Sequence, residues 1–218
     1  MPTLSEFLNL VEPLAQRSAV GLSVLFILVV LVFSDWRLII AGFALLKVLA
    51  GILLTRLLPP EWALLQWLSG GIMGVMWFLS ARRVDTIRRR QLGIPWWQPQ
   101  WRLDMSTLMR LSLMLLLLIV AYTIRPLFPF PNLPSDLGRL STFLALAALL
   151  GLGLGEQPLR WGVSLAMWIL AGHFVIFALQ VNVDTVGLLA SLDILLGFAI
   201  SYLIIVDGAR TWPHAEEV

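Results

Sequence analysis

The sequence predicts an all-α membrane protein, a transmembrane bundle of seven helices, and three observations support this prediction. Hydrophobic residues make up 59% of the 218-residue chain and charged residues only 13%, whereas about a quarter of a soluble domain is charged. The mean hydropathy is +0.89. Apolar runs of membrane-crossing length recur along the chain, and a helix satisfies its own backbone hydrogen bonds in hydrocarbon.

The first three expected spans are bounded by charged or helix-breaking residues. The first, 18–34, follows the segment 1–17, which lacks the basic n-region of a secretory signal, so we expect a retained span. The second, 38–58, begins after the link SDWR and ends at Pro59–Pro60. The third, 61–81, ends where a run of arginines begins.

The last four expected spans follow a long polar loop. The fourth, 107–128, has LSLMLLLLIV at its centre and is expected to face lipid. The fifth, 139–155, is the shortest, so a six-span bundle in which this segment is re-entrant or interfacial remains an alternative. The sixth, 161–181, and the seventh, 184–206, are long and apolar.

The chain is therefore expected to form one membrane domain with a simple division. This division comprises three spans (18–81), a basic, tryptophan-rich loop (82–106), four spans (107–206) and a short tail (207–218). When residues 37–82 are slid onto 160–205 the hydropathy matches but the identities do not, so a parallel repeat is expected at the level of hydropathy only.

Arginines predict the orientation, because Lys and Arg near span ends stay on the cytoplasmic side. Seven of them fall in or beside the long loop, which we therefore place in the cytoplasm: Arg82, Arg83, Arg88, Arg89, Arg90, Arg102 and Arg110. With seven spans, the N-terminus lies outside and the C-terminus in the cytoplasm. We expect a multi-pass protein of a prokaryotic cytoplasmic membrane.

The same loop has two interpretations. Tryptophans among prolines and arginines are typical of a segment lying at the level of the lipid headgroups. The lipid-interface residues would then be Arg88, Arg89, Arg90, Trp96, Trp97 and Trp101. Alternatively, the loop is a docking surface for a cytoplasmic partner subunit.

Three ionisable residues lie near the centre of expected spans: Lys47, His173 and Asp193. Ionisable residues there are costly, about 2.5–3.5 kcal/mol for a lysine or an aspartate on insertion scales, so they indicate function or buried pairing. Lys47 and Asp193 each share a helical stripe with small residues, which predicts that both face protein. The functional interpretation is an ion or proton relay, and the structural one is a pair that fixes helix register. His173 alone is also explained by a hydrogen bond to a neighbouring carbonyl or hydroxyl.

Small residues at helical spacing predict close helix contacts. They are Gly70 and Gly74 in the third span, Ala147, Gly151 and Gly155 in the fifth, and Gly197 in the seventh.

Cofactor, metal and nucleic-acid functions are not expected. The chain has no cysteine, which excludes disulfides, thiolate zinc sites and iron–sulfur ligation. Its second histidine, His214, is in the tail, so a bis-histidine haem has no ligand pair. The seventh span lacks the lysine to which retinal proteins attach retinal. A net charge of +2 and the lack of a phosphate loop argue against nucleic acid and nucleotides.

The last spans, LRWGVSLAMWILAGHFVIFAL and DTVGLLASLDILLGFAISYLI, resemble the C-terminal half of hydrogenase-4 component E, which is related to the small 4L-type subunit of respiratory complex I. In that family an LR pair precedes a span with a histidine, and the next span carries an aspartate. Arg160, His173 and Asp193 match these positions. The family's glutamate ahead of the histidine has no counterpart here, where Trp168, Ile169 and Leu170 occupy the neighbourhood, so its usual proton route is in doubt.

The sequence favours a non-catalytic membrane subunit of a larger, energy-coupling complex that translocates protons or cations or is linked to redox chemistry. The extramembrane chain is too short for a soluble catalytic domain, so we do not expect an enzyme. The expected partners are the bilayer and other membrane subunits. Two alternatives stay open: a small stand-alone transporter with the Lys/His/Asp site, and a membrane scaffold or assembly factor.

Overall fold

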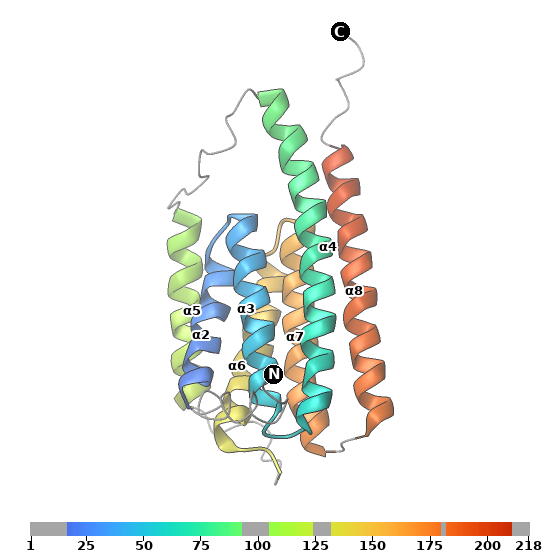
Figure 1. Cartoon of the computed structure of the whole chain (residues 1–218). Helices are drawn as coiled ribbons and strands as arrows, with labels where there is room; N and C mark the ends of the chain where they lie inside the picture. Colours follow the sequence, from blue (N-terminus) through green and yellow to red (C-terminus); the bar gives the residue numbers. More distant parts are fainter. Residues whose placement is uncertain (1–16, 93–104, 124–131, 180–181, 211–218) are drawn as a thin grey trace.

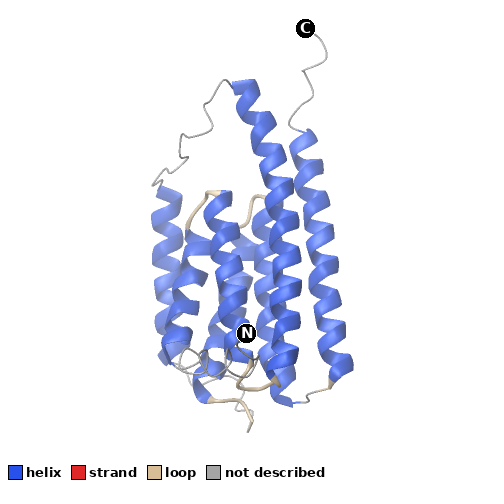
Figure 2. Cartoon of the chain, in the orientation of Figure 1, coloured by secondary structure: helices blue, strands red, loops and turns tan. Residues whose placement is uncertain are grey.

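In the computed structural model, residues 17–92, 105–123, 132–179 and 182–210 are described, and in these ranges the chain is all-α with no strand (Figures 1 and 2). The all-α part of the predicted fold class is thereby confirmed. The helices of this part of the chain are α2 (Arg17–Val32), α3 (Trp36–Leu54), α4 (Pro60–Leu92), α5 (Met105–Thr123), α6 (Ser135–Leu154), α7 (Pro158–Leu179) and α8 (Val183–Arg210).

Five of these helices are long and apolar enough to cross a membrane, which supports an integral membrane protein. They are α3, α4 over Leu64–Arg90, α6, α7, and α8 over Val183–Ala209. Helix α6 is the expected fifth span, and its 20 residues reach membrane-crossing length. The apolar parts of α2 and α5, Ser18–Val32 and Thr107–Thr123, are shorter.

The end of α3 differs from the expected second span for a local reason. Asp35 caps its start, where the carboxylate accepts a hydrogen bond from the backbone N–H of Arg37 at 2.9 Å. The helix ends at Leu54 instead of residue 58, because the approaching prolines 59 and 60 cannot continue it and the backbone turns first.

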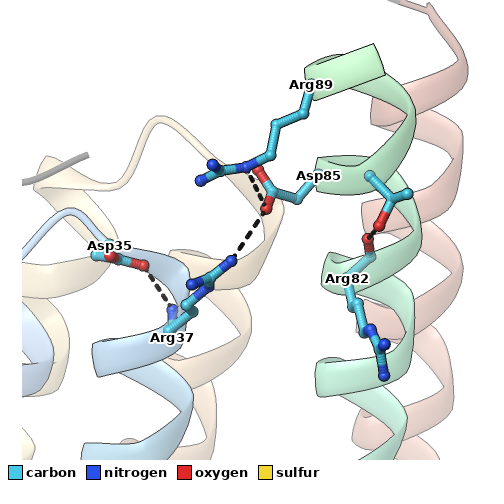
Figure 3. Close-up of polar contacts among 6 residues, drawn as sticks. Asp35, Arg37, Arg82, Asp85 and Arg89 are labelled. Atoms are coloured by element: carbon cyan, nitrogen blue, oxygen red, sulfur yellow. Dashed lines mark hydrogen bonds and ion pairs between the residues drawn. The ribbon is translucent and has the colours of Figure 1, made fainter. Parts of the chain in front are cut away.

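The expected loop 82–106 was wrong in its first part, since α4 continues as a helix through Leu92. Residues 82–92 contain neither proline nor glycine, and an ion pair from Asp85 Oδ2 to Arg89 Nε, four residues on, stabilises this turn at 2.8 Å. Figure 3 shows that Arg37 of α3 also points at the Asp85 carboxylate, 3.8 Å away. The tail likewise begins later than expected, because α8 continues to Arg210.

The helices run roughly parallel and antiparallel to one another and give the bundle two ends (Figure 1). We call the end that carries Arg82, Arg83 and Arg88–Arg90 of α4 the arginine end, and the opposite one the Pro60 end. Helices α4 and α8 lie side by side along their length and project beyond their neighbours at the arginine end.

Helices four apart in sequence pack on each other: α2 on α6, α3 on α7 and, most extensively, α4 on α8. The expected parallel repeat in hydropathy thus coincides with neighbouring helices. Ion pairing also links distant segments at the Pro60 end, where Arg56 Nη1 lies 2.6 Å from Asp136 Oδ2. This arrangement brings the inner faces of α3, α4, α7 and α8 together, and the candidate site lies among them.

Candidate functional site

Lys47 of α3 and Asp193 of α8 form an ion pair in the core. The distance from Lys47 Nζ to Asp193 Oδ2 is 2.6 Å, and the exposed fractions of the two side chains are 2% and 0%. Both face the protein interior, as their small-residue stripes predicted. The pair joins residues 146 positions apart, so helix packing brings it together and local sequence does not.

Helix α4 lies against both partners of the pair. Ser69 donates a hydrogen bond from Oγ to Asp193 Oδ2 at 3.3 Å, and a side chain at Gly70 would meet the Lys47 aliphatic chain at 3.0–3.2 Å. Gly70 therefore gives the lysine the room to cross α4 and reach α8. Asp193 Oδ1 has no hydrogen-bond partner among the described residues.

Gln66, one turn before Gly70 on α4, is a further polar member of this region. Its side chain is only 1% exposed, and neither its amide oxygen nor its amide nitrogen has a hydrogen-bond partner in the described part of the chain. Sequence reasoning missed both Gln66 and Ser69. The signal was available, because a glutamine one turn from Gly70 in an apolar span is itself costly to bury.

His173 of α7 is fully buried and close to the pair without being bonded to it. Its imidazole interacts electrostatically with Lys47 and Asp193, and its ring centroid lies 5.7 Å from that of Phe177. Neither ring nitrogen has a hydrogen-bond partner among the described residues. The expected bond to a neighbouring carbonyl or hydroxyl is therefore not found there. The structure groups the three predicted residues, but hydrogen bonds join only two of them.

Towards the arginine end the pair is covered by an aromatic layer. Phe43 and Trp77, both 0% exposed, have ring centroids 5.1 Å apart, and the Lys47 ammonium lies 5.9 Å from the Phe43 centroid. The indole Nε1 of Trp77 donates to the backbone oxygen of Gly197 at 3.2 Å. A side chain at Gly197 would lie 2.6 Å from Met76 Cε, so this glycine allows α4 and α8 to approach closely.

The other small residues predicted to pack fall into two groups. Ala147 is buried, Gly151 lies against Ser164, and Gly155, which follows the last residue of α6, lies against Trp161. Gly74 differs, since a side chain there would meet nothing within 4 Å. Small residues on one helix face thus do not all mark contacts.

Of the predicted lipid-interface residues, the three arginines of α4 lie at the arginine end. Arg88 and Arg90 are exposed, while Arg89 is buried and its guanidinium is paired with Asp85 (Figure 3). Trp96, Trp97 and Trp101 lie outside the described residues. Their assignment to the interface remains a prediction.

No group of three or more His, Cys, Asp or Glu side chains that could hold a metal ion occurs in the described ranges. The site therefore offers proton-exchanging and hydrogen-bonding groups: an amine, a carboxylate, an imidazole, a hydroxyl and an amide. Comparison of the chain with protein-family models, with curated proteins and with solved structures gives no match.

Proposed function

We propose that the chain is a non-catalytic, proton-conducting membrane subunit of a larger energy-coupling assembly, with Lys47 and Asp193 at its proton-transfer site. The observation that supports this most strongly is the 2.6 Å ion pair between α3 and α8, whose two side chains are at most 2% exposed. Ionisable groups at this depth belong to ion and proton pathways or to buried pairs, so the pair needs a functional or a structural reason.

Stability alone is a weak reason for this pair. Replacing a buried ion pair by apolar residues of similar volume is often neutral or stabilising by about 1–4 kcal/mol, because both ions lose their hydration. Leu or Met at positions 47 and 193 would hold α3 and α8 together as well as the charges do. The stability of the bundle therefore does not by itself account for the pair.

Unpartnered polar atoms around the pair favour proton transfer over a register lock. Asp193 Oδ1, both His173 nitrogens and both polar atoms of Gln66 are buried without hydrogen-bond partners among the described residues. A lock is most stable when every polar group is satisfied, since each unsatisfied one costs about 1–3 kcal/mol. Groups with free hydrogen-bonding capacity are what a proton relay requires, and buried groups of this kind bind internal water.

The proton is a better substrate for this site than a metal cation. Hard cations bind through about six or more oxygen ligands, whereas Asp193 shares its space with an ammonium group. A proton that arrives on Oδ1 neutralises the carboxylate and removes its attraction for Lys47. When that proton leaves towards the next acceptor, the carboxylate charge and the ion pair return.

The proposal includes seven spans, with the arginine end in the cytoplasm. Helix α2 is short, but it packs on α3, α5 and α6 within the bundle, and α5 packs on α2 and α6. Both therefore lie at the depth of neighbours that are long enough to span. Arg83 is exposed, and a single cysteine at this position is expected to react with an impermeant maleimide from the cytoplasmic side only. Labelling from the other side alone would show that the orientation is the opposite one.

The subunit form of the proposal rests on two points. The described chain is almost entirely helix within the bundle, and the last spans resemble hydrogenase-4 component E. The alternatives of a stand-alone transporter and of a scaffold differ from it in measurable ways. A transporter conducts without partners, and a scaffold does not conduct at all.

Proton flux into proteoliposomes tests the proposal. The protein is purified in mild detergent with the partners that accompany it and is reconstituted into vesicles that enclose a pH-sensitive dye. A potassium diffusion potential drives the flux. We expect Asp193→Asn to lower the flux per folded protein at least about tenfold, because the transferring carboxylate is removed. The amount of folded protein is measured alongside, since the unpaired Lys47 ammonium also costs stability. The matched control is Asp136→Asn. The Asp136 carboxylate also has a cationic partner at 2.6 Å, the Arg56 guanidinium, but this pair is part-exposed at the Pro60 end.

Each outcome bears on the proposal. Equal flux in wild type and Asp193→Asn overturns the relay, and no flux in the wild-type assembly supports the scaffold instead. Flux by the chain alone, as a monodisperse homo-oligomer, supports the stand-alone transporter.

A further inference from the structure

The ion pair does not lie midway between the two ends of the bundle. At 1.5 Å per residue, Lys47 is about 10 Å from the end of α3 at Leu54 but about 16 Å from its start at Trp36. His173 is about 9 Å from the end of α7 at Leu179, which is also the Pro60 end. The polar cluster is thus displaced towards the Pro60 end.

Polar side chains lie on the Pro60 side of the pair. On α4 the residues Gln66, Ser69, Met73 and Trp77 recur at helical spacing, and all four are at most 2% exposed, so they form one inward-facing stripe. The two polar members are those nearest to Pro60. Gln66 lies about 9 Å from that end, one turn from the hydroxyl that donates to Asp193.

The other direction is closed by large apolar groups. Met73 and Trp77 continue the α4 stripe towards the arginine end, and Phe43 of α3 packs against the indole. The Trp77–Gly197 hydrogen bond holds this layer to α8. Beyond it lies Ser201 of α8, whose buried hydroxyl has no partner among the described residues. Polar groups therefore occur on both sides of the layer, which separates them.

We infer that protons reach the Lys47–Asp193 pair from the Pro60 end, through Gln66 and Ser69, and that Phe43, Met73 and Trp77 block the direct route from the arginine end. A primary amide and a hydroxyl both donate and accept hydrogen bonds, so they can order the water that carries a proton, whereas thioether and aromatic side chains exclude it. This inference rests on the proposed proton function and adds the side from which the site is loaded.

Single-cysteine accessibility tests the inference directly, because the natural chain contains no cysteine and has no background of free thiols. Gln66→Cys and Ser201→Cys are compared in vesicles whose sidedness is established with Arg83→Cys. Silver ion, a small cation that reacts with thiols, is added to one side at a time. The thiols left free are then counted by maleimide labelling after denaturation.

We expect Gln66→Cys to be blocked at least about tenfold faster from the Pro60 side than from the arginine side, because a thiol reacts as the thiolate, which needs a polar, hydrated surrounding. Ser201→Cys, the matched control beyond the aromatic layer, is not blocked from the Pro60 side. Adding Trp77→Ala to Gln66→Cys is expected to open the second route and make the blocking rates from the two sides similar.

Faster blocking of Gln66→Cys from the arginine side, equal blocking from both sides, or no blocking from either side overturns the inference. The folded state of each variant is checked by circular dichroism, and Gln66→Ser, which keeps a small polar group, reports on folding without a thiol. Labelling does not depend on flux. A chain that labels as expected but carries no protons refutes the proposed function, and one that conducts but labels from the wrong side refutes only the route.

Discussion

Removing the charges of Lys47 and Asp193, singly and together, separates the energetics of the ion pair from its use. Lys47→Met keeps most of the length of the side chain and leaves the Asp193 carboxylate, 0% exposed, without its partner. Asp193→Leu leaves the ammonium unpaired in the same way. The double variant Lys47→Met/Asp193→Leu removes both charges and puts apolar side chains of similar heavy-atom shape in their place.

The structure gives the expected magnitudes. At 2.6 Å and an effective dielectric constant of about 20, two unit charges attract by about 6 kcal/mol. The desolvation of both ions offsets much of this attraction. Each single variant is expected to lose about 3–5 kcal/mol of unfolding free energy, because a lone buried charge remains. The unfolding free energy of the double variant is expected to lie within about 1 kcal/mol of the wild-type value or above it.

Unfolding in mixed micelles, followed by circular dichroism, measures these differences as a double-mutant cycle. The matched control is Arg56→Met/Asp136→Leu, since this pair has the same 2.6 Å separation but side chains that are 30% and 28% exposed. The coupling energy between Arg56 and Asp136 is expected to be at most about 1 kcal/mol. If the Lys47/Asp193 double variant lost the sum of the two single losses, the charges would not form an energetic unit. If it were stable and still conducted protons, the relay would be refuted while the packing account survived.

Two further predictions concern packing and capping. Gly70→Ala is expected to lower the unfolding free energy by about 1–3 kcal/mol, because its Cβ would press on the Lys47 chain at 3.0–3.2 Å. Gly74→Ala, on the same helix, meets nothing within 4 Å and is expected to change it by at most about 0.5 kcal/mol, so equal losses in the same micelle assay would contradict the described packing. Asp35→Ala is expected to cost about 1 kcal/mol through the lost cap of α3, whereas Asp35→Asn, which can still accept from the Arg37 N–H, should lose much less; equal effects of the two substitutions would show that the cap does not contribute.

Helix positions followed well from the sequence because each depends on short-range properties. An apolar run of about 20 residues forms a helix in hydrocarbon, since the backbone has no other partner there. Prolines near residue 59 and the polar link before Trp36 bound α3 within a few residues of its expected ends. The extension of α4 to Leu92 was missed because a run of arginines was used as the signal that ends a span, whereas charged residues do not end a helix.

Which side chains meet was a different question. Hydropathy singled out Lys47, His173 and Asp193, and the small-residue stripes predicted the inward direction of the first and the last. The same pattern was misleading at Gly74, where a side chain would meet nothing within 4 Å. It was silent on Gln66, whose burial depends on which face of α4 the bundle covers.

By itself, the sequence determined that this chain is a helical membrane protein with three costly ionisable residues in its apolar helices. Composition and the spacing of apolar residues suffice for that, because transfer of side chains from water to hydrocarbon and backbone hydrogen bonding act on each residue separately. Only the tertiary structure decided that α4 lies against α8, that Lys47 passes Gly70 to reach Asp193, and that His173 stays unbonded beside them. These contacts depend on how helix surfaces fit together across more than a hundred residues of chain, and no local pattern encodes that fit.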